Sequence, residues 1–163
     1  MVARTFDPRP ELGLARAPAV PSALADPSRP KVLLVEDEAD MRAYLRKHLA
    51  PHYEVLEAAD GDAGLQMVRQ EMPDVIVSDI LMPGLDGYAL CRALKSDAAT
   101  NFIPVILLSV RTEQQSRIDA FECGADYLSN PCDPAELLLR IRNRLLARAL
   151  FMRLTAHELR RRE

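Results

Sequence analysis

Three short apolar runs, at 32–35, 75–77 and 105–108, are rich in β-branched residues and almost uninterrupted by polar ones. Such runs are typical of strands that are buried on both faces of a parallel sheet. Residues 53–58 and 125–129 fit two further strands. The apolar pattern therefore predicts five strands, all of them from residue 31 onward.

Apolar residues at helical spacing fill the stretches between these strands. They are Met41, Leu45 and Leu49, then Leu65 and Val68, then Leu90, Cys91 and Leu94, then Ile118 and Phe121. A fifth helix is expected to start near Pro134, and the connections contain Gly61, Gly84, Gly87 and Gly124. Because strands and helices alternate, right-handed crossovers place helices on both faces of the sheet. We predict a doubly wound α/β fold, a three-layer α/β/α sandwich around a five-stranded parallel sheet.

The first thirty residues have a different composition. They hold six of the twelve prolines and show no apolar periodicity, which predicts a flexible leader over 1–30. Pro18 and Pro21 interrupt its apolar stretch at 15–25, so a signal peptide is not expected. The chain also has no run of about 18 apolar residues that would predict a membrane span. We therefore expect a cytoplasmic protein.

Composition narrows the function classes further. A chain of 163 residues with 48% hydrophobic residues is expected to form one domain. Cys91, Cys123 and Cys132 form no Cys-x-x-Cys pair, so we expect reduced thiols rather than disulfides or a zinc site. The net charge of −3 gives no overall electrostatic reason to expect nucleic-acid binding.

Polar residues follow the predicted strands directly. They are Glu36, Asp37 and Glu38 after the first strand, Asp79 after the third, Ser109 after the fourth, and Ser129, Asn130 and Pro131 after the fifth. Ligands of doubly wound folds bind at these strand ends. If the first and third strands are neighbours, Glu36, Asp37 and Asp79 converge, and their charges must be neutralised. Oxygen ligands without His or Cys favour a hard cation, and Mg²⁺ is the best candidate.

An aspartate beside Mg²⁺ can act as a nucleophile toward a phosphoryl group, because the cation screens the two negative charges from each other. Asp79 is the natural acceptor, and Ser109 could donate a hydrogen bond to a phosphoryl oxygen. Taken singly, Asp37 and Glu38 fit helix caps or solvated loop residues better, and Ser109 fits a cap as well as a ligand. The three carboxylates together favour a functional site.

Three segments resemble, in sequence and in order, the receiver domain of two-component response regulators. They are residues 31–38 (KVLLVEDE), 78–87 (SDILMPGLDG) and 104–109 (PVILLS). The resemblance covers 31–147 and implies a flavodoxin-like fold, with residues 148–163 as a basic helical extension. It also implies a signalling domain rather than an enzyme, with at most self-phosphorylation and autodephosphorylation.

The resemblance also implies roles for single residues. Asp79 corresponds to the acceptor of a phosphoryl group from a histidine kinase or a phosphotransfer protein. Glu36, Asp37 and Asp79, with the backbone carbonyl of Leu81, correspond to the Mg²⁺ ligands. Ser109 corresponds to the switch hydroxyl. Tyr127 corresponds to the aromatic residue that turns inward on phosphorylation and changes the partner-binding surface of the fourth helix and fifth strand.

The sequence departs from the family pattern at several positions. Asn130 precedes Pro131 where the family has lysine, so a neutral amide replaces an ammonium group, although the Asn-Pro bond could still be cis. Val110 follows Ser109 where a small residue is usual and could narrow access for the phosphodonor. Residues 124–127 look one residue shorter than usual, and Cys132 replaces a common phenylalanine, as a small buried apolar residue. These departures keep open a degenerate receiver that signals without phosphorylation.

The last helix is expected to be longer than one receiver helix. Its apolar residues at spacings of three and four are Leu138, Ile141, Leu145, Ala149, Met152, Ala156 and Leu159. Arginines flank them, which fits a dimerising helix or a signalling linker, while a frayed solvated end fits equally well. A homodimer could form there or through the fourth helix and fifth strand. Residues 156–160 are faintly similar to a histidine-kinase phosphorylation box, and no DNA-binding module fits after the receiver.

Overall fold

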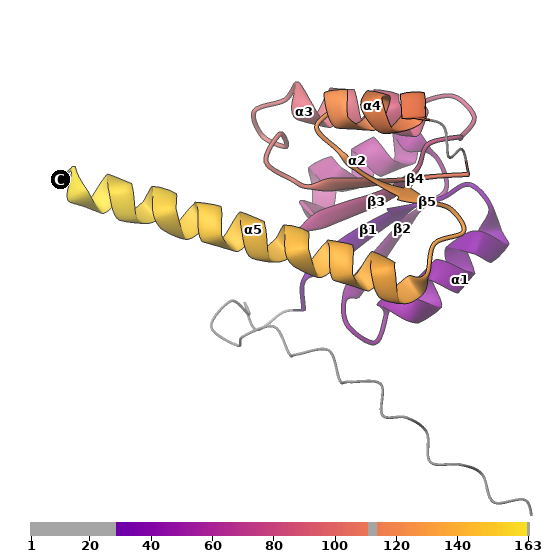
Figure 1. The fold of residues 1–163 in the computed structure, drawn as a ribbon, viewed down its shortest axis with the longest axis horizontal. Coiled ribbons are helices and arrows are strands. Elements are labelled where there is room, and N and C mark those ends of the chain that lie inside the picture. Colours follow the sequence, from indigo (N-terminus) through magenta and orange to yellow (C-terminus); the bar gives the residue numbers. More distant parts are fainter. Residues whose placement is uncertain (1–28, 111–113, 163) are drawn as a thin grey trace, which may run out of the picture.

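A computed structural model of the chain describes residues 29–110 and 114–162, and for residues 114–117 it describes the backbone alone (Figure 1). Of the leader predicted over 1–30, residues 1–28 lie outside the described residues. Strands and helices alternate along the described chain in the predicted order. They are β1 (Lys31–Val35), α1 (Ala39–Leu49), β2 (Glu54–Ala58), α2 (Gly61–Glu71), β3 (Val75–Asp79), α3 (Gly87–Lys95), β4 (Val105–Ser109), α4 (Gln114–Glu122), β5 (Asp126–Ser129) and α5 (Pro134–Arg161).

All strand pairs in the sheet are parallel, and the strand order is β2-β1-β3-β4-β5. Strand β1 lies between β2 and β3, and its register pairs Val35 with Ala58 on one side and with Ser78 on the other. The chain therefore reverses its direction of winding between β1 and β3, where doubly wound folds bind ligands. The predicted flavodoxin-like α/β fold, with first and third strands adjacent, is confirmed.

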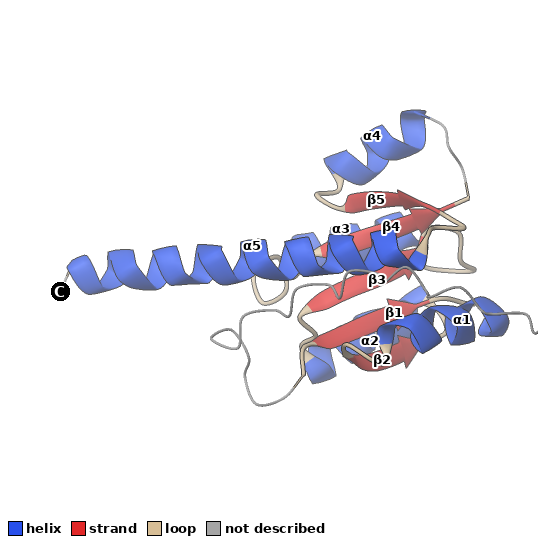
Figure 2. Ribbon diagram, turned by 60° about the horizontal axis from the view of Figure 1, so that its bottom comes forward, coloured by secondary structure: helices blue, strands red, loops and turns tan. Residues whose placement is uncertain are grey.

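Helices cover both faces of the sheet (Figures 1 and 2). Successive residues of β1 point to opposite faces: Leu33 packs into a core shared with α2 and α3, and Leu34 into a core shared with α1 and α5. Both residues are fully buried. Burial on both faces explains why the central strands are almost continuously apolar.

Helix α4 differs from the prediction in its packing. The sequence predicted Ile118 and Phe121 as its core-facing residues, but 42% of Ile118 and 83% of Phe121 is exposed. Ala120 is buried instead and packs into the core beneath α2 and α3. The prediction was wrong because α4 lies over β5 at the edge of the sheet. Among the side chains described for residues 118–122, only that of the small Ala120 is buried.

Helix α5 starts as the sequence predicts, with Pro134 in its first turn and the carboxylate of Asp133 accepting a 2.9 Å hydrogen bond from the backbone N–H of Ala135. Its first half packs on the sheet through Leu137 and Ile141. Its second half continues past the sheet into solvent (Figures 1 and 2). The helix is continuous through residue 147, where the extension was expected to begin. No helix in the described ranges is long and apolar enough to cross a membrane.

Candidate functional site

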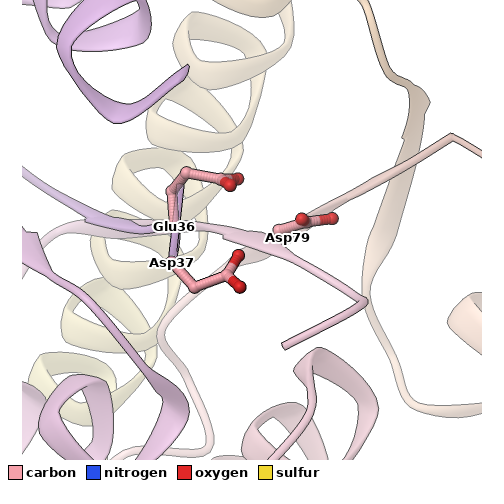
Figure 3. A group of neighbouring side chains, drawn as sticks. All are labelled: Glu36, Asp37 and Asp79. Carbon is pink, nitrogen blue, oxygen red and sulfur yellow. The ribbon is translucent and has the colours of Figure 1, made fainter. Parts of the chain in front are cut away.

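Three carboxylates meet at the carboxyl edge of the sheet. Glu36 and Asp37 directly follow β1, and Asp79 is the last residue of β3. One carboxylate oxygen from each lies within 4.8 Å of the other two. Figure 3 shows the three side chains leaving two neighbouring strands and turning toward a common space. The convergence predicted from the sequence follows from the β1–β3 pairing.

Backbone contacts fix Glu36 in this position. Its N–H donates to the carbonyl of Ala58 at 3.1 Å, and its carbonyl accepts a 2.8 Å hydrogen bond from the guanidinium of Arg42. One oxygen of its carboxylate, Oε1, accepts from the N–H of Glu38 at 3.2 Å. The other, Oε2, is buried without a hydrogen-bond partner among the described residues, and the whole residue is only 2% exposed. A buried carboxylate oxygen without a donor is costly, and a cation would satisfy it.

The electrostatics of the site also favour a cation. Burial, together with the negative charges of Asp79 and Asp37, raises the pKa of Glu36 to about 7, although the Glu38 N–H opposes the shift. Burial likewise raises the pKa of Asp79, against the hydrogen bonds from the backbone of Ile80 and Leu81. The ligand set contains only oxygen, so the residues present fit Mg²⁺.

Two neighbours complete the surroundings of Asp79. Leu81 is half-exposed, and its backbone N–H bonds to the Asp79 carboxylate, while the role of its carbonyl as a ligand stays a prediction. Gly87, which the sequence placed in a connection, is the first residue of α3. Its N–H donates to the carbonyl of Ile80 at 2.9 Å, and a Cβ there would lie 2.4 Å from the carbonyl oxygen of Asp79. The sequence pattern did not predict this close approach of α3 to the end of β3. Its only signal in the sequence is a glycine that directly follows the Asp86 cap of the helix.

Ser109 and Asn130 lie at the carboxyl ends of the two strands on one side of β3. Ser109 ends β4, the neighbour of β3, and Asn130 directly follows β5, which pairs with β4. Strand register places Asp79 opposite Leu108, so Ser109 lies one residue farther toward the carboxyl edge and is 2% exposed. The N–H of Asn130 donates to the carbonyl of Ser109 at 2.6 Å, Asn130 is buried, and the Asn130–Pro131 peptide is cis. The backbones of Ser109 and of the residue at the family's lysine position are thus hydrogen-bonded to each other at the carboxyl ends of β4 and β5, while the roles of both side chains stay predictions.

The other predicted positions lie farther out. Tyr127 is half-buried in β5, opposite Leu107, and packs against the core beneath α2 and α3. Val110 is 62% exposed just beyond β4. Cys132 packs at the border of the core beneath α1 and α5 as a small apolar side chain, and burial raises the pKa of its thiol. The structure therefore does not group these three side chains with the carboxylates.

Comparison with known proteins agrees with this geometry. The family model of the response regulator receiver domain matches residues 32–142. The chain is 41% identical over 135 residues to the response regulator PleD of Caulobacter vibrioides, covering 82% of this chain and 29% of PleD. It is 42% identical over 117 residues to the probable transcriptional regulator ycf27 of Guillardia theta, covering 71% of this chain and 45% of that protein. The chain thus spans less than half the length of these two relatives.

Solved structures show the same likeness. The receiver domain of a signal transduction histidine kinase from Syntrophus aciditrophicus has a TM-score of 0.68 and 33% identity, covering 72% of this chain and 91% of that one. The chemotaxis protein CheY4 of Vibrio cholerae has a TM-score of 0.67 and 30% identity, and the match covers 71% of this chain and 98% of that one. Sequence, fold and the acidic strand ends agree, and the chain belongs to the response regulator receiver domain family of two-component signalling.

Proposed function

We propose that the chain accepts a phosphoryl group on Asp79 from a histidine kinase or a phosphotransfer protein and thereby changes a partner-binding surface. The observation that carries this proposal is the carboxylate cluster itself, in which the buried Oε2 of Glu36 has no partner among the described residues and faces two further acids. Three carboxylates this close to one another repel, and a bound cation would neutralise that repulsion.

The chemistry assigned to the site is a phosphoryl transfer. A carboxylate oxygen of Asp79 forms the new P–O bond while the P–N bond of a donor phosphohistidine breaks. The imidazole nitrogen keeps the bonding electron pair and takes up a proton. Glu36, Asp37 and Asp79 would hold Mg²⁺, which when bound neutralises the charge that develops on the phosphoryl oxygens. The Ser109 hydroxyl would donate to one of those oxygens.

In this proposal, phosphorylation of Asp79 changes the partner-binding surface through β4 and β5. Ser109 and Tyr127 lie on these adjacent strands, and α4 packs over β5. A hydrogen bond from Ser109 to the phosphoryl group would favour an inward position of Tyr127 and shift α4. A partner protein or a second copy would bind this surface of α4 and β5. We also infer a reducing, cytoplasmic setting, which suits the three free thiols.

A second function is favoured by Asn130. A neutral amide at this buried position supplies no charge to a phosphoryl group, whereas lysine would. A receiver that keeps the fold and the Mg²⁺ site but signals through constitutive protein binding would fit this substitution. The two functions differ in whether Asp79 is phosphorylated at all.

The experiment is phosphoryl incorporation from acetyl phosphate or phosphoramidate, followed by the intact mass of the protein. We expect the parent chain to gain one phosphoryl group with Mg²⁺ and none with a chelator, and Asp79→Asn to gain none. Asp86→Asn, in the α3 cap outside the cluster, is the matched control and should still gain it. A parent chain that gains none, while Asn130→Lys does, would instead support the phosphorylation-independent receiver.

A further inference from the structure

The free half of α5 carries apolar side chains that nothing in the described chain covers. Phe151 is 69% exposed, Met152 53% and Leu159 63%. This half lies beyond the amino ends of the strands, whereas the carboxylate cluster lies at their carboxyl ends (Figure 1). A contiguous exposed apolar surface of this kind marks an interaction site.

These side chains form one wall of an elongated groove of about 640 Å³. The other wall comes from the amino edge of the sheet, where Phe102 and Pro104 precede β4. Arg148 holds the two walls together: its guanidinium lies 5.0 Å from the centre of the Phe102 ring and donates to the carbonyl of Asp74 at 2.9 Å. From Arg144 to Leu159 the α5 wall is about 24 Å long at 1.5 Å per residue. This length suits a helical segment better than a compact small molecule.

Three cationic side chains line the groove, and two of them already have a carboxylate partner. Arg144 is paired with Asp126 at 3.0 Å and Arg148 with Asp74 at 3.5 Å. Lys95 also lines the groove. Within the described ranges it donates to the carbonyl oxygens of Asn101 and Ile103 and has no carboxylate partner. Burial, and the charge of Arg144, lower the pKa of Lys95, although the Cys91 thiol opposes the shift. A carboxylate entering the groove would supply the missing negative charge.

Charge also distinguishes between the three kinds of partner that could occupy the groove: a second copy of the chain, a nucleic acid and a helix of another protein. Residues 148–162 contain five arginines against one glutamate. A second copy of the helix would therefore bring arginine against arginine, and like charges at the edges of a helix pair oppose pairing. A nucleic acid would use the arginines but leave Phe151 and Met152 in water. An acidic amphipathic helix satisfies both features, because its apolar face covers the apolar stripe and its carboxylates face the cations.

We propose that this groove, between the free half of α5 and the amino edge of the sheet, binds an acidic amphipathic helix of a partner protein. The apolar face of that helix packs on Phe151, Met152 and Leu159. Its carboxylates pair with Lys95 and with Arg160, which follows Leu159 at the outer end of the groove. The site lies at the opposite end of the sheet from Asp79, so we expect the unphosphorylated chain to bind this helix.

The test uses the full chain and a fluorescent synthetic peptide of about 18 residues, long enough for five helical turns. Leucines occupy one face of the peptide and glutamates the other. A matched peptide has lysine in place of every glutamate. Binding is followed by fluorescence anisotropy at low and high salt, and sedimentation reports the oligomeric state.

We expect the glutamate peptide to bind in the micromolar range, more weakly at high salt, and the lysine peptide not to bind. Phe151→Ser should weaken binding about tenfold, a size typical of an anchoring aromatic residue. Leu150→Ser, equally exposed on the same helix but outside the groove, should leave it unchanged. Arg160→Glu should weaken binding, whereas Arg92→Glu on α3 should not. Asp79→Asn should bind the peptide like the parent, which separates this test from that of phosphorylation.

Three results would overturn the proposal. The first is failure of the glutamate peptide to bind, or equal binding of the lysine peptide. The second is a parent dimer that Phe151→Ser dissociates, which would show that a second copy covers the groove. The third is a DNA duplex that binds the parent and Phe151→Ser alike and displaces the peptide, which would assign α5 to nucleic acid.

Discussion

At the scale of single residues, the position of Glu36 is unfavourable without a cation. Its carboxylate is buried, and the side chains of Asp37 and Asp79 lie beside it. The folded chain therefore holds a proton on Glu36 more tightly than the unfolded chain does, with a pKa of about 7 against an ordinary value of 4.5. Protonation of Glu36 therefore stabilises the folded chain. Its contribution to the free energy of unfolding is complete below the pKa of the unfolded chain, 4.5, and is lost as the pH rises through about 7.

This linkage predicts the effect of Glu36→Gln on the metal-free protein. At pH 8 the substitution removes a buried charge and should raise the free energy of unfolding by about 1–3 kcal/mol. At pH 5 the parent is already protonated there, so the two proteins should differ little. Urea unfolding in a chelator measures both values. Equal free energies of unfolding for the parent and Glu36→Gln at pH 8 would show that the charge of Glu36 does not destabilise the fold.

Asn130 allows a second prediction at this scale. Asn130→Lys introduces an ammonium group at a buried position next to Ser109, where it can form a charge-assisted hydrogen bond to a phosphoryl oxygen. We expect the initial rate of phosphorylation by phosphoramidate to rise about tenfold, or about 1.4 kcal/mol. Asn130→Gln keeps the amide neutral and is the control. A rate that Asn130→Lys leaves unchanged would mean that a cation at position 130 does not contribute to transfer.

At the scale of secondary-structure elements, the start of α3 positions the end of β3. A Cβ on Gly87 would lie 2.4 Å from the Asp79 carbonyl oxygen and 2.8 Å from the Cα of Ile80, both of them backbone atoms that cannot move aside alone. Helix and strand can approach this closely only with glycine at position 87.

Gly87→Ala should therefore push β3 and α3 apart. We expect a loss of about 1–3 kcal/mol in the free energy of unfolding, as for other overpacked sites, together with slower phosphorylation of Asp79. Chemical denaturation and intact-mass kinetics measure the two effects. Arg92→Ala, at an exposed position of the same helix, should change neither. If Gly87→Ala behaved like Arg92→Ala, the close approach would have no structural role.

The same scale shows what the sequence could predict. The strands were predictable because a strand covered on both faces must be apolar at consecutive positions, as in 32–35 and 105–108. The acidic site was predictable because parallel strands end at one edge. The packing of α4 was not, since two apolar residues three apart do not define a helix face, and Phe121 is exposed. Nor was the contact of Gly87 with Asp79, because it depends on a tertiary approach that no local pattern encodes.

At the scale of the whole molecule, the two candidate functions lie at opposite ends of the sheet. The carboxylates lie at its carboxyl edge, and the free half of α5 extends past its amino edge (Figures 1 and 2). Helix α5 is anchored to the domain by Leu137 and Ile141 and, through Asp126, by the guanidinium groups of Arg140 and Arg144. The part beyond residue 149 adds little to these anchors.

We therefore predict that a chain ending at Ala149 folds with a free energy of unfolding within about 1 kcal/mol of the parent and is phosphorylated at the same rate, because the removed side chains are mostly exposed. A chain ending at Ala135, which lacks Leu137 and Ile141, should not fold. Circular dichroism and denaturant titration distinguish these outcomes. Strong destabilisation of the chain ending at Ala149 would show that the free half of α5 is part of the core.

The central claim, that Asp79 accepts the phosphoryl group, is tested most directly by locating the modification on the chain. The parent is phosphorylated with acetyl phosphate and Mg²⁺, reduced with borohydride, which converts an aspartyl phosphate to homoserine, and digested for peptide sequencing by mass spectrometry. The account predicts homoserine at position 79 and unmodified acids at positions 36 and 37. Homoserine at another aspartate, or none under conditions in which a known receiver is modified, would contradict it.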